Sequence, residues 1–294
     1  MKWFAWWMLL ACFSTAALAD EHDAAQELSA AQIVEKNVAA RGGLEAWRKI
    51  QTMVWVGHIE SANAPAPNLP FVLELKRPDK ARFEIKAQNQ VTAHIYDGTH
   101  GWKLRPSRSG QPELQPYTPA ELSFAKNGPG LDGPLMDYQA KGVAVTLDGI
   151  DEVEGHKAYR LSVKLASGVS HHVWIDAHNF LDIKYDRESR NTLGLSGTLS
   201  VYYRNYRTIE GLQIPHLIES GAGTGKATDK MVIDRILLNL PLEDLVFAKP
   251  GMPGRRKTVS AESGSRQAVR QTPSGPKELP QLYPPTVSGS LGTQ

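Results

Sequence analysis

Apolar and polar side chains alternate along most of the chain between Thr52 and Leu240. A period of two places successive side chains on opposite faces, which is typical of strands with one buried row. Turn signals such as Arg77-Pro78-Asp79 and Asp97-Gly98 separate the runs, because aspartate and glycine tolerate the positive φ of tight turns. The pattern predicts about 11 or 12 antiparallel strands. They are expected at residues 52–60, 71–76, 82–86, 91–95, 102–104, 143–147, 159–165, 169–176, 181–185, 199–206, 212–218 and 231–240.

The first predicted strand is apolar on both of its faces. Met53, Trp55 and Ile59 form one row, and Val54 and Val56 belong to the other. A strand with two apolar rows is expected to be covered on both sides.

Two helical segments precede this strand. Residues 29–41 have an amphipathic pattern, and Ser29 with Gln32 three positions later has the spacing of a capping box. Gly42-Gly43 should end this helix. A shorter helical turn is expected over residues 44–50.

The alternation stops between residues 106 and 141. Thr118 and Glu121 form a second capping-box pattern with Pro119 at the first helical position, so a short helix to about Lys126 is predicted. Glycine and proline residues follow as breakers. A second short helical piece is expected around Leu135, Met136 and Tyr138. The composition of the whole segment favours a mobile cover over the sheet.

The N-terminal 19 residues have the form of a secretory signal peptide. Their apolar stretch, 3–13, is shorter than the ~20 residues that span a bilayer, and Ala17-Leu18-Ala19 fits a cleavage site. Export to a bacterial periplasm is therefore predicted. The only cysteine, Cys12, lies in a sequence like a lipoprotein acylation site, so lipidation at Cys12 is the alternative.

Charge is distributed unevenly between the predicted domain and the C-terminal tail. The chain carries a formal charge of +2, whereas residues 20–249 hold 26 basic and 29 acidic side chains. This balance argues against nucleic-acid binding by the folded domain. Residues 250–294 are rich in proline, glycine and serine and carry a net +4, which predicts a disordered tail. Such a tail could contact anionic lipid at a membrane surface, or serve as a solvated linker.

No local motif indicates catalysis or a cofactor. His171, His172, Asp176 and His178 are close in sequence, but His171 and His172 should point to opposite faces of a strand and cannot share a metal ion. A further acidic group is predicted to lie at a solvated hairpin tip. It comprises Asp148, Asp151, Glu152 and Glu154. The chain is therefore predicted to be a binding protein without catalytic residues, metal or cofactor, and a hydrolase or metal-dependent enzyme is the less favoured alternative.

Large apolar side chains are the candidate lining of a ligand cavity. The alternative for each of them is ordinary core packing. The candidates are Trp55, Phe71, Phe83, Trp102, Leu135, Tyr138 and Trp174.

Several stretches together resemble the LolA/LolB-like superfamily of periplasmic outer-membrane lipoprotein-sorting proteins. The resemblance covers roughly residues 29–247. It is carried by Ala40-Arg41-Gly42-Gly43-Leu44-Glu45-Ala46-Trp47, Ile95-Tyr96-Asp97-Gly98 with Gly101-Trp102, Gly155 to Leu165 with Trp174-Ile175-Asp176, Tyr203-Arg204-Asn205-Tyr206, and Gly211-Leu212-Gln213-Ile214-Pro215.

This resemblance implies a half-open antiparallel barrel whose mouth is partly closed by helices. It also implies an apolar interior that binds lipid or lipoprotein acyl chains, with a place in lipoprotein or lipid sorting. The segment 106–141 is then the natural candidate for part of the closure. A scaffold that binds another envelope protein through the same fold is the alternative function.

Overall fold

The computed structural model describes six stretches of the chain, namely residues 28–61, 66–87, 90–106, 112–190, 196–222 and 229–251. The predicted signal peptide, the alternative lipidation site at Cys12 and all but the first two residues of the predicted tail lie outside these stretches. The side chains of residues 188–190, 196 and 222 are likewise outside the description.

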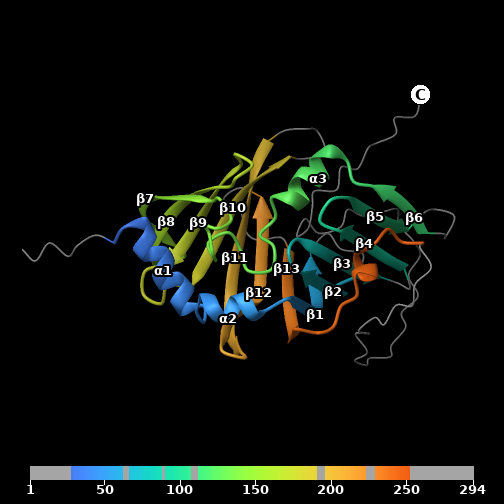
Figure 1. The fold of residues 1–294 in the computed structure, drawn as a ribbon, viewed down its shortest axis with the longest axis horizontal. Coiled ribbons are helices and arrows are strands. Elements are labelled where there is room, and N and C mark those ends of the chain that lie inside the picture. Colours follow the sequence, from blue (N-terminus) through green and yellow to red (C-terminus); the bar gives the residue numbers. More distant parts are fainter. Residues whose placement is uncertain are drawn as a thin grey trace, which may run out of the picture.

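The described residues form one antiparallel sheet of 13 strands together with three α-helices and one 3₁₀ helix (Figure 1). The helices are α1 (Ala30–Ala40), α2 (Leu44–Lys49), α3 (Pro119–Lys126) and the 3₁₀ helix η1 (Asp244–Phe247). The strands are β1 (Thr52–Ser61), β2 (Leu69–Lys76), β3 (Lys80–Ala87), β4 (Gln90–Tyr96), β5 (Gly101–Pro106), β6 (Pro112–Pro116), β7 (Ala144–Val153), β8 (His156–Lys164), β9 (Ser170–Asp176), β10 (Asp182–Arg190), β11 (Ser196–Ile209), β12 (Leu212–Ala222) and β13 (Asp229–Leu238).

The strand order is β6-β5-β4-β3-β2-β1-β13-β12-β11-β10-β9-β8-β7, so β6 and β7 are the two edges and the sheet does not close into a barrel. Each strand pairs with its sequence neighbour, except where β1 joins β13 and where the covering segment separates β6 from β7. The predicted class, a mainly β protein with a few helices and a large antiparallel half-open sheet, is confirmed.

The two faces of the sheet are covered by different elements. Met53, Leu73 and Phe83 belong to a buried cluster with residues of α2, on the face that also carries α1 and α3; we call it the cavity face (Figure 1). On the opposite, outer face, Val54 and Val56 pack against residues around η1. The two-sided covering that the apolar pattern of β1 predicts is therefore confirmed.

Both predicted capping boxes are present. Ser29 Oγ accepts from the backbone of Gln32, and Thr118 Oγ1 accepts from the backbone of Glu121. Gly42 follows α1 with a φ of +111°, and a Cβ there would lie 2.5 Å from the carbonyl oxygen of Gly211. Only glycine fits this close approach between the end of α1 and the start of β12.

Three predictions of local structure were wrong. Strand β6 was missed because prolines stand at both of its ends, a pattern that only an edge strand tolerates. Only Glu154 of the acidic group lies at the hairpin tip, because β7 continues through Asp148 to Val153 and the turn lies at Glu154-Gly155. The piece around Leu135 and Met136 consists of turns instead of a helix.

The turns that replace this helix follow from residues that oppose regular helical geometry. Gly130, Gly133 and Asp137 all have positive φ. Leu135 and Met136 are nevertheless almost completely buried, so the segment contributes to the core as well as covering the sheet. No helix within the described ranges is long and apolar enough to cross a membrane.

Candidate functional site

A cavity of about 560 Å³ lies between the cavity face of the sheet and the segment formed by α3 and residues 127–134. Small-molecule sites typically have volumes of ~300–1,000 Å³. The floor of the cavity is formed by strands on both sides of the pairing between β1 and β13. Its apolar lining residues are Trp47, Trp55, Leu73, Leu75, Ala81, Val173, Val201, Ile214, Ile218 and Met231.

The covering segment resembles a loop more than a core helix where it faces the cavity. Phe124, Leu131 and the glycine- and proline-rich residues between them contribute to the lining. The glycines and prolines have little side-chain volume to fill the space below them. The segment 106–141, predicted as part of the closure, therefore supplies the roof of the cavity.

One end of the cavity carries polar side chains from β9 and β10. His171 and Arg187 line it together with Tyr185, and the rings of His171 and Tyr185 are 5.1 Å apart. The guanidinium carbon of Arg187 lies 4.2 Å from the ring centroid of Phe124 in α3. Burial lowers the pKa of His171 to about 4, and the charge of Arg187 adds to this shift.

A second polar group lines the cavity where α1 meets β10. Arg41 Nε lies 3.5 Å from Asp182 Oδ2, and Tyr206 donates a hydrogen bond of 2.9 Å to the Asp182 carbonyl. Asn37 donates to the Phe180 carbonyl at 2.8 Å. The charge of Arg41 is therefore balanced within the protein.

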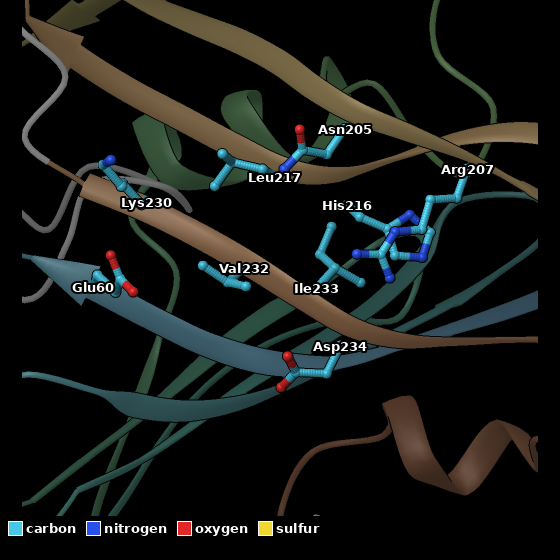
Figure 2. Close-up of a pocket in the computed structure, with 9 residues that line it drawn as sticks. All are labelled: Glu60, Asn205, Arg207, His216, Leu217, Lys230, Val232, Ile233 and Asp234. Carbon is cyan, nitrogen blue, oxygen red and sulfur yellow. The ribbon is translucent and has the colours of Figure 1, made fainter.

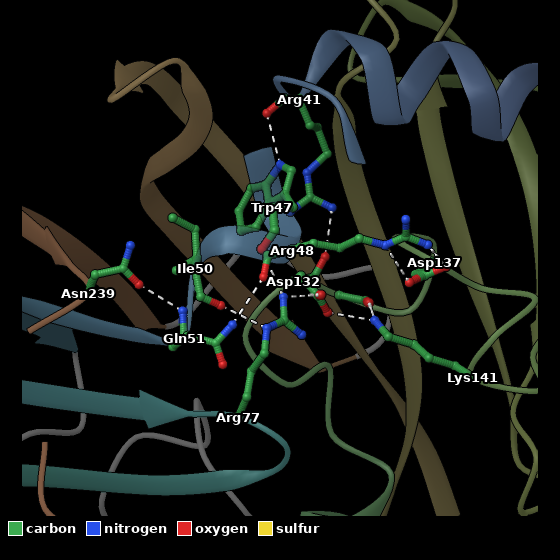
Figure 3. Close-up of polar contacts among 11 residues, drawn as sticks. Arg41, Trp47, Arg48, Ile50, Gln51, Arg77, Asp132, Asp137, Lys141 and Asn239 are labelled. Atoms are coloured by element: carbon green, nitrogen blue, oxygen red, sulfur yellow. Dashed lines mark hydrogen bonds and ion pairs between the residues drawn. The ribbon is translucent and has the colours of Figure 1, made fainter. Parts of the chain in front are cut away.

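The segment after α3 is fixed to the rest of the molecule through Asp132. Arg77 donates to Asp132 Oδ2 at 2.7 Å, Lys141 donates to Oδ1 at 2.6 Å, and Arg41 donates to the Asp132 carbonyl at 3.0 Å (Figure 3). Arg77 also donates to the Trp47 and Ile50 carbonyls. Asp132 thus joins the roof of the cavity to the end of α1 through its carbonyl and to the β2–β3 turn through its carboxylate, and Arg77 extends this link to α2.

A second link to the same segment is more exposed. Arg48 in α2 donates to both carboxylate oxygens of Asp137 at 3.0 Å (Figure 3). Hydrogen bonding to Arg48 lowers the pKa of Asp137. Because both side chains are partly solvated, this pair contributes less to stability than the buried contacts of Asp132.

Helix α3 is attached by a buried ion pair. Lys103 Nζ of β5 donates to the two carboxylate oxygens of Glu121 at 2.7 and 2.9 Å, and both side chains are at most 5% exposed. Burial alone would raise the pKa of Glu121, but hydrogen bonds from Lys103 and Thr118 outweigh it and the pKa falls. Glu121 is the one fully buried side chain of α3.

The predicted lining residues are distributed over both faces of the sheet. Trp55 lines the cavity. Phe71 and Phe83 lie on the same face but pack into the core, with ring centroids 5.7 Å apart. Leu135 and Tyr138 belong to the cluster beneath α1.

The other two predicted residues, Trp102 and Trp174, lie on the outer face. Trp102 pairs with Ile95, whereas the neighbouring Lys103 points toward α3. Trp174 packs with Val153 and Ala158 and donates to Asp151 at 2.9 Å. That these two residues line the cavity stays a prediction, and their position on the outer face does not support it.

Sequence reasoning did not select His171, Arg187 or Phe124 as cavity residues. Polar residues in a strand are usually assigned to the solvent row, and His171 alternates with Ser170 and His172 in a way that leaves the inner row undecided. The signal that identifies His171 is its shared row with Val173 and Ile175, both fully or almost fully buried.

The predicted histidine cluster is divided between the two faces. His171 lines the cavity, while His172 lies 3.5 Å from Asp148 on the outer face. Asp176 accepts from the backbones of His178 and Asn179 and thus shapes the turn after β9. In the part of the chain that the structure describes, no three potential ligand side chains converge as a metal site would require.

A smaller hollow of about 350 Å³ lies on the outer face near β1 and β13 (Figure 2). It carries charges of both signs, and burial lowers the pKa of its one histidine, His216. The residues that line it are Glu60, Asn205, Arg207, His216, Leu217, Lys230, Val232, Ile233 and Asp234. This lining is polar and charged, whereas the larger cavity is lined mainly by apolar side chains. The larger cavity therefore suits an apolar ligand better.

Comparison with known proteins gives matches among solved structures. No protein-family model matches the chain, and no curated protein matches it. Among solved structures, a LolA superfamily protein from Nitrosomonas europaea is 18% identical with a TM-score of 0.48, and the match covers 76% of this chain and 98% of that one. A putative outer membrane lipoprotein-sorting protein domain from Vibrio parahaemolyticus is 12% identical with a TM-score of 0.49, covering 74% and 95%.

A third solved structure, a DUF1329 family protein from Desulfovibrio piger, is 12% identical with a TM-score of 0.48 and covers 74% of this chain and 97% of that one. The proteins to which this chain is similar thus include LolA superfamily and lipoprotein-sorting proteins, as the sequence resemblance indicated.

Proposed function

We propose that this protein binds the acyl chain of a lipid or lipoprotein in the cavity beneath α3, and that it acts in the periplasm as a carrier or sorting protein without performing chemistry. One observation carries the proposal: a covered cavity of about 560 Å³ whose floor is made of aromatic and aliphatic side chains. A flexible apolar chain needs contact area more than directed polar groups, and this floor supplies it.

The energy of such binding needs no catalytic or metal group. Each buried methylene contributes ~0.8 kcal/mol, so about a dozen supply on the order of 10 kcal/mol before the ordering of the chain is subtracted. A protein with this function should lack compact catalytic motifs, as this sequence does.

The proposal predicts a specific dependence of affinity on chain length. Displacement of a fluorescent acyl probe by saturated fatty acids should improve by roughly fourfold per added methylene, which corresponds to ~0.8 kcal/mol, until the cavity is filled. Fluorescence titration measures each dissociation constant. Native mass spectrometry of protein purified from cells should also show bound lipid.

A matched pair of variants tests the location of the site. Val201→Phe adds volume to the floor of the cavity, and it should shorten the longest chain that gains affinity. Val232→Phe makes the same change on the outer face and should leave the chain-length series unchanged. A flat series, or recovery of a single protein partner without lipid, would count against acyl binding and favour a scaffold.

A further inference from the structure

His171 is a buried polar side chain that faces the cavity and makes no hydrogen bond with the described residues. It is 7% exposed, and neither ring nitrogen has a partner among them. A buried polar group without a partner lowers the stability of the folded state, so such groups are rare in folded proteins. A ligand atom in the cavity would satisfy this imidazole.

Arg187 brings a positive charge to the same end of the cavity. His172 pairs with Asp186 across β9 and β10, which makes His171 and Arg187 neighbours one residue further along the two strands. Burial lowers the pKa of Arg187 to about 10, so the group remains charged at neutral pH. Its guanidinium carbon lies 4.2 Å from the ring centroid of Phe124 in the roof, and the N–H donors of a guanidinium lie at the edge of its plane.

Three other cations of the lining form ion pairs within the described residues. Arg41 is close to Asp182, and Lys76 and Lys80 lie 2.7 and 2.8 Å from Asp244. Where His171 of β9 and Arg187 of β10 line the cavity, a buried guanidinium charge lies beside an imidazole.

We propose that His171 and Arg187 form a headgroup site for an anionic amphiphile, with the carboxylate or phosphate of the ligand at this end and its acyl chain along the apolar floor. The inference rests on the proposed acyl binding and adds the class of headgroup and its orientation. The guanidinium supplies charge-assisted hydrogen bonds. The neutral imidazole supplies one donor, while its second nitrogen can accept from a hydroxyl group of the ligand.

The test compares ligands that share one acyl chain and differ in the headgroup. The probes are a long-chain fatty acid, its methyl ester, the matching monoacylglycerol and the matching lysophosphatidic acid. The full chain should bind the fatty acid or the lysophosphatidic acid at least about tenfold more tightly than the two neutral ligands. The better of the two anions identifies the headgroup as carboxylate or phosphate.

Three variants locate this preference. Arg187→Met keeps a long side chain under Phe124, and His171→Phe keeps the ring beside Tyr185; each should reduce anion binding while neutral ligands bind as before. Lys184→Met removes a cation from the outer face of β10, 4.0 Å from Trp174, and should change neither class. Binding of the neutral ligands also shows that each variant is folded.

The outcomes separate this inference from the proposed function. Equal affinity of the unmodified protein for the acid and its methyl ester would overturn the headgroup site and leave acyl binding intact, without reference to any variant. An anion preference that survives in both Arg187→Met and His171→Phe would overturn it as well. Failure of all four ligands to bind would instead refute the proposed function.

Discussion

Helices α1 and α3 lie over the same face of the sheet, but only α1 fills the space beneath it. Ile33 and Val34 of α1 are at most 2% exposed and pack against β8 and β9. The buried side chain of α3 is Glu121, which is held by Lys103. Both helices begin with a capping box, so the difference lies in the faces they present and not in how they start.

This difference explains why the cavity lies where it does. A helix with an apolar stripe gains free energy by direct contact with the sheet and leaves no volume. A helix attached at one end by an ion pair, and followed by glycine and proline, is fixed in position without filling the space. Polar attachment of the roof is therefore what keeps an apolar cavity available.

Removal of the ion pair should have the largest effect. Lys103→Met leaves the Glu121 carboxylate buried without its partner, which we expect to lower the free energy of unfolding by about 3–5 kcal/mol. Urea unfolding measures this loss, and acyl-probe binding should weaken with it because α3 is displaced.

Two controls make this prediction specific. Lys103→Met combined with Glu121→Leu should recover most of the stability, since no charge remains buried. Ile33→Ala in α1 should also cost about 2–5 kcal/mol but leave probe affinity unchanged in the folded protein. Equal loss of binding in both single variants would show that the two helices are not distinct in function.

The caps allow a milder comparison. Ser29→Ala and Thr118→Ala each remove one capping hydrogen bond and should each cost about 1 kcal/mol in urea unfolding. Only Thr118→Ala frays the first turn over the cavity, so only this variant should weaken binding of the acyl probe. A matching loss of affinity in Ser29→Ala would contradict the separation of the two helices.

The parts of the fold that sequence reasoning predicted correctly depend on local signals. Alternation identified twelve of the strands, and the two capping boxes placed α1 and α3. Strand β6 was missed because its prolines are acceptable only at a sheet edge, and edge position is a property of the whole sheet.

The candidate site was harder to predict for a related reason. Alternation separates two rows of side chains without saying which row faces the cavity, and in β9 one row contains His171 while the other contains Trp174. The aromatic side chain was selected as a cavity residue and the histidine was not, whereas in the structure His171 lines the cavity and Trp174 packs on the outer face. The deciding information is the position of α1 and α3, which a strand pattern does not contain.

Low pH should lower the free energy of unfolding through His94, which lies on the α3 side of the molecule. Its partners in the sheet are Phe83 and Lys103, so it lies beneath α3, and burial, with the charge of Arg105 next, lowers its pKa to about 4. An unfolded histidine titrates near 6.5, so below that pH the unfolded chain binds a proton that the folded chain does not. Stability contributed by neutral His94 is therefore complete above pH ~6.5 and falls as the pH drops toward 4.

Between pH 7.5 and 5.5 this one histidine should lower the free energy of unfolding by roughly 1 kcal/mol, in a range where most carboxylates stay ionised. Urea unfolding at each pH measures the slope, and His94→Gln should reduce it by that amount. His178→Gln, in the turn after β9, is the matched control and should leave the slope as it is. If the free energy of unfolding of His94→Gln depends on pH as steeply as that of the unmodified protein, His94 does not cause the acid sensitivity. The sensitivity would then come from other groups of the fold.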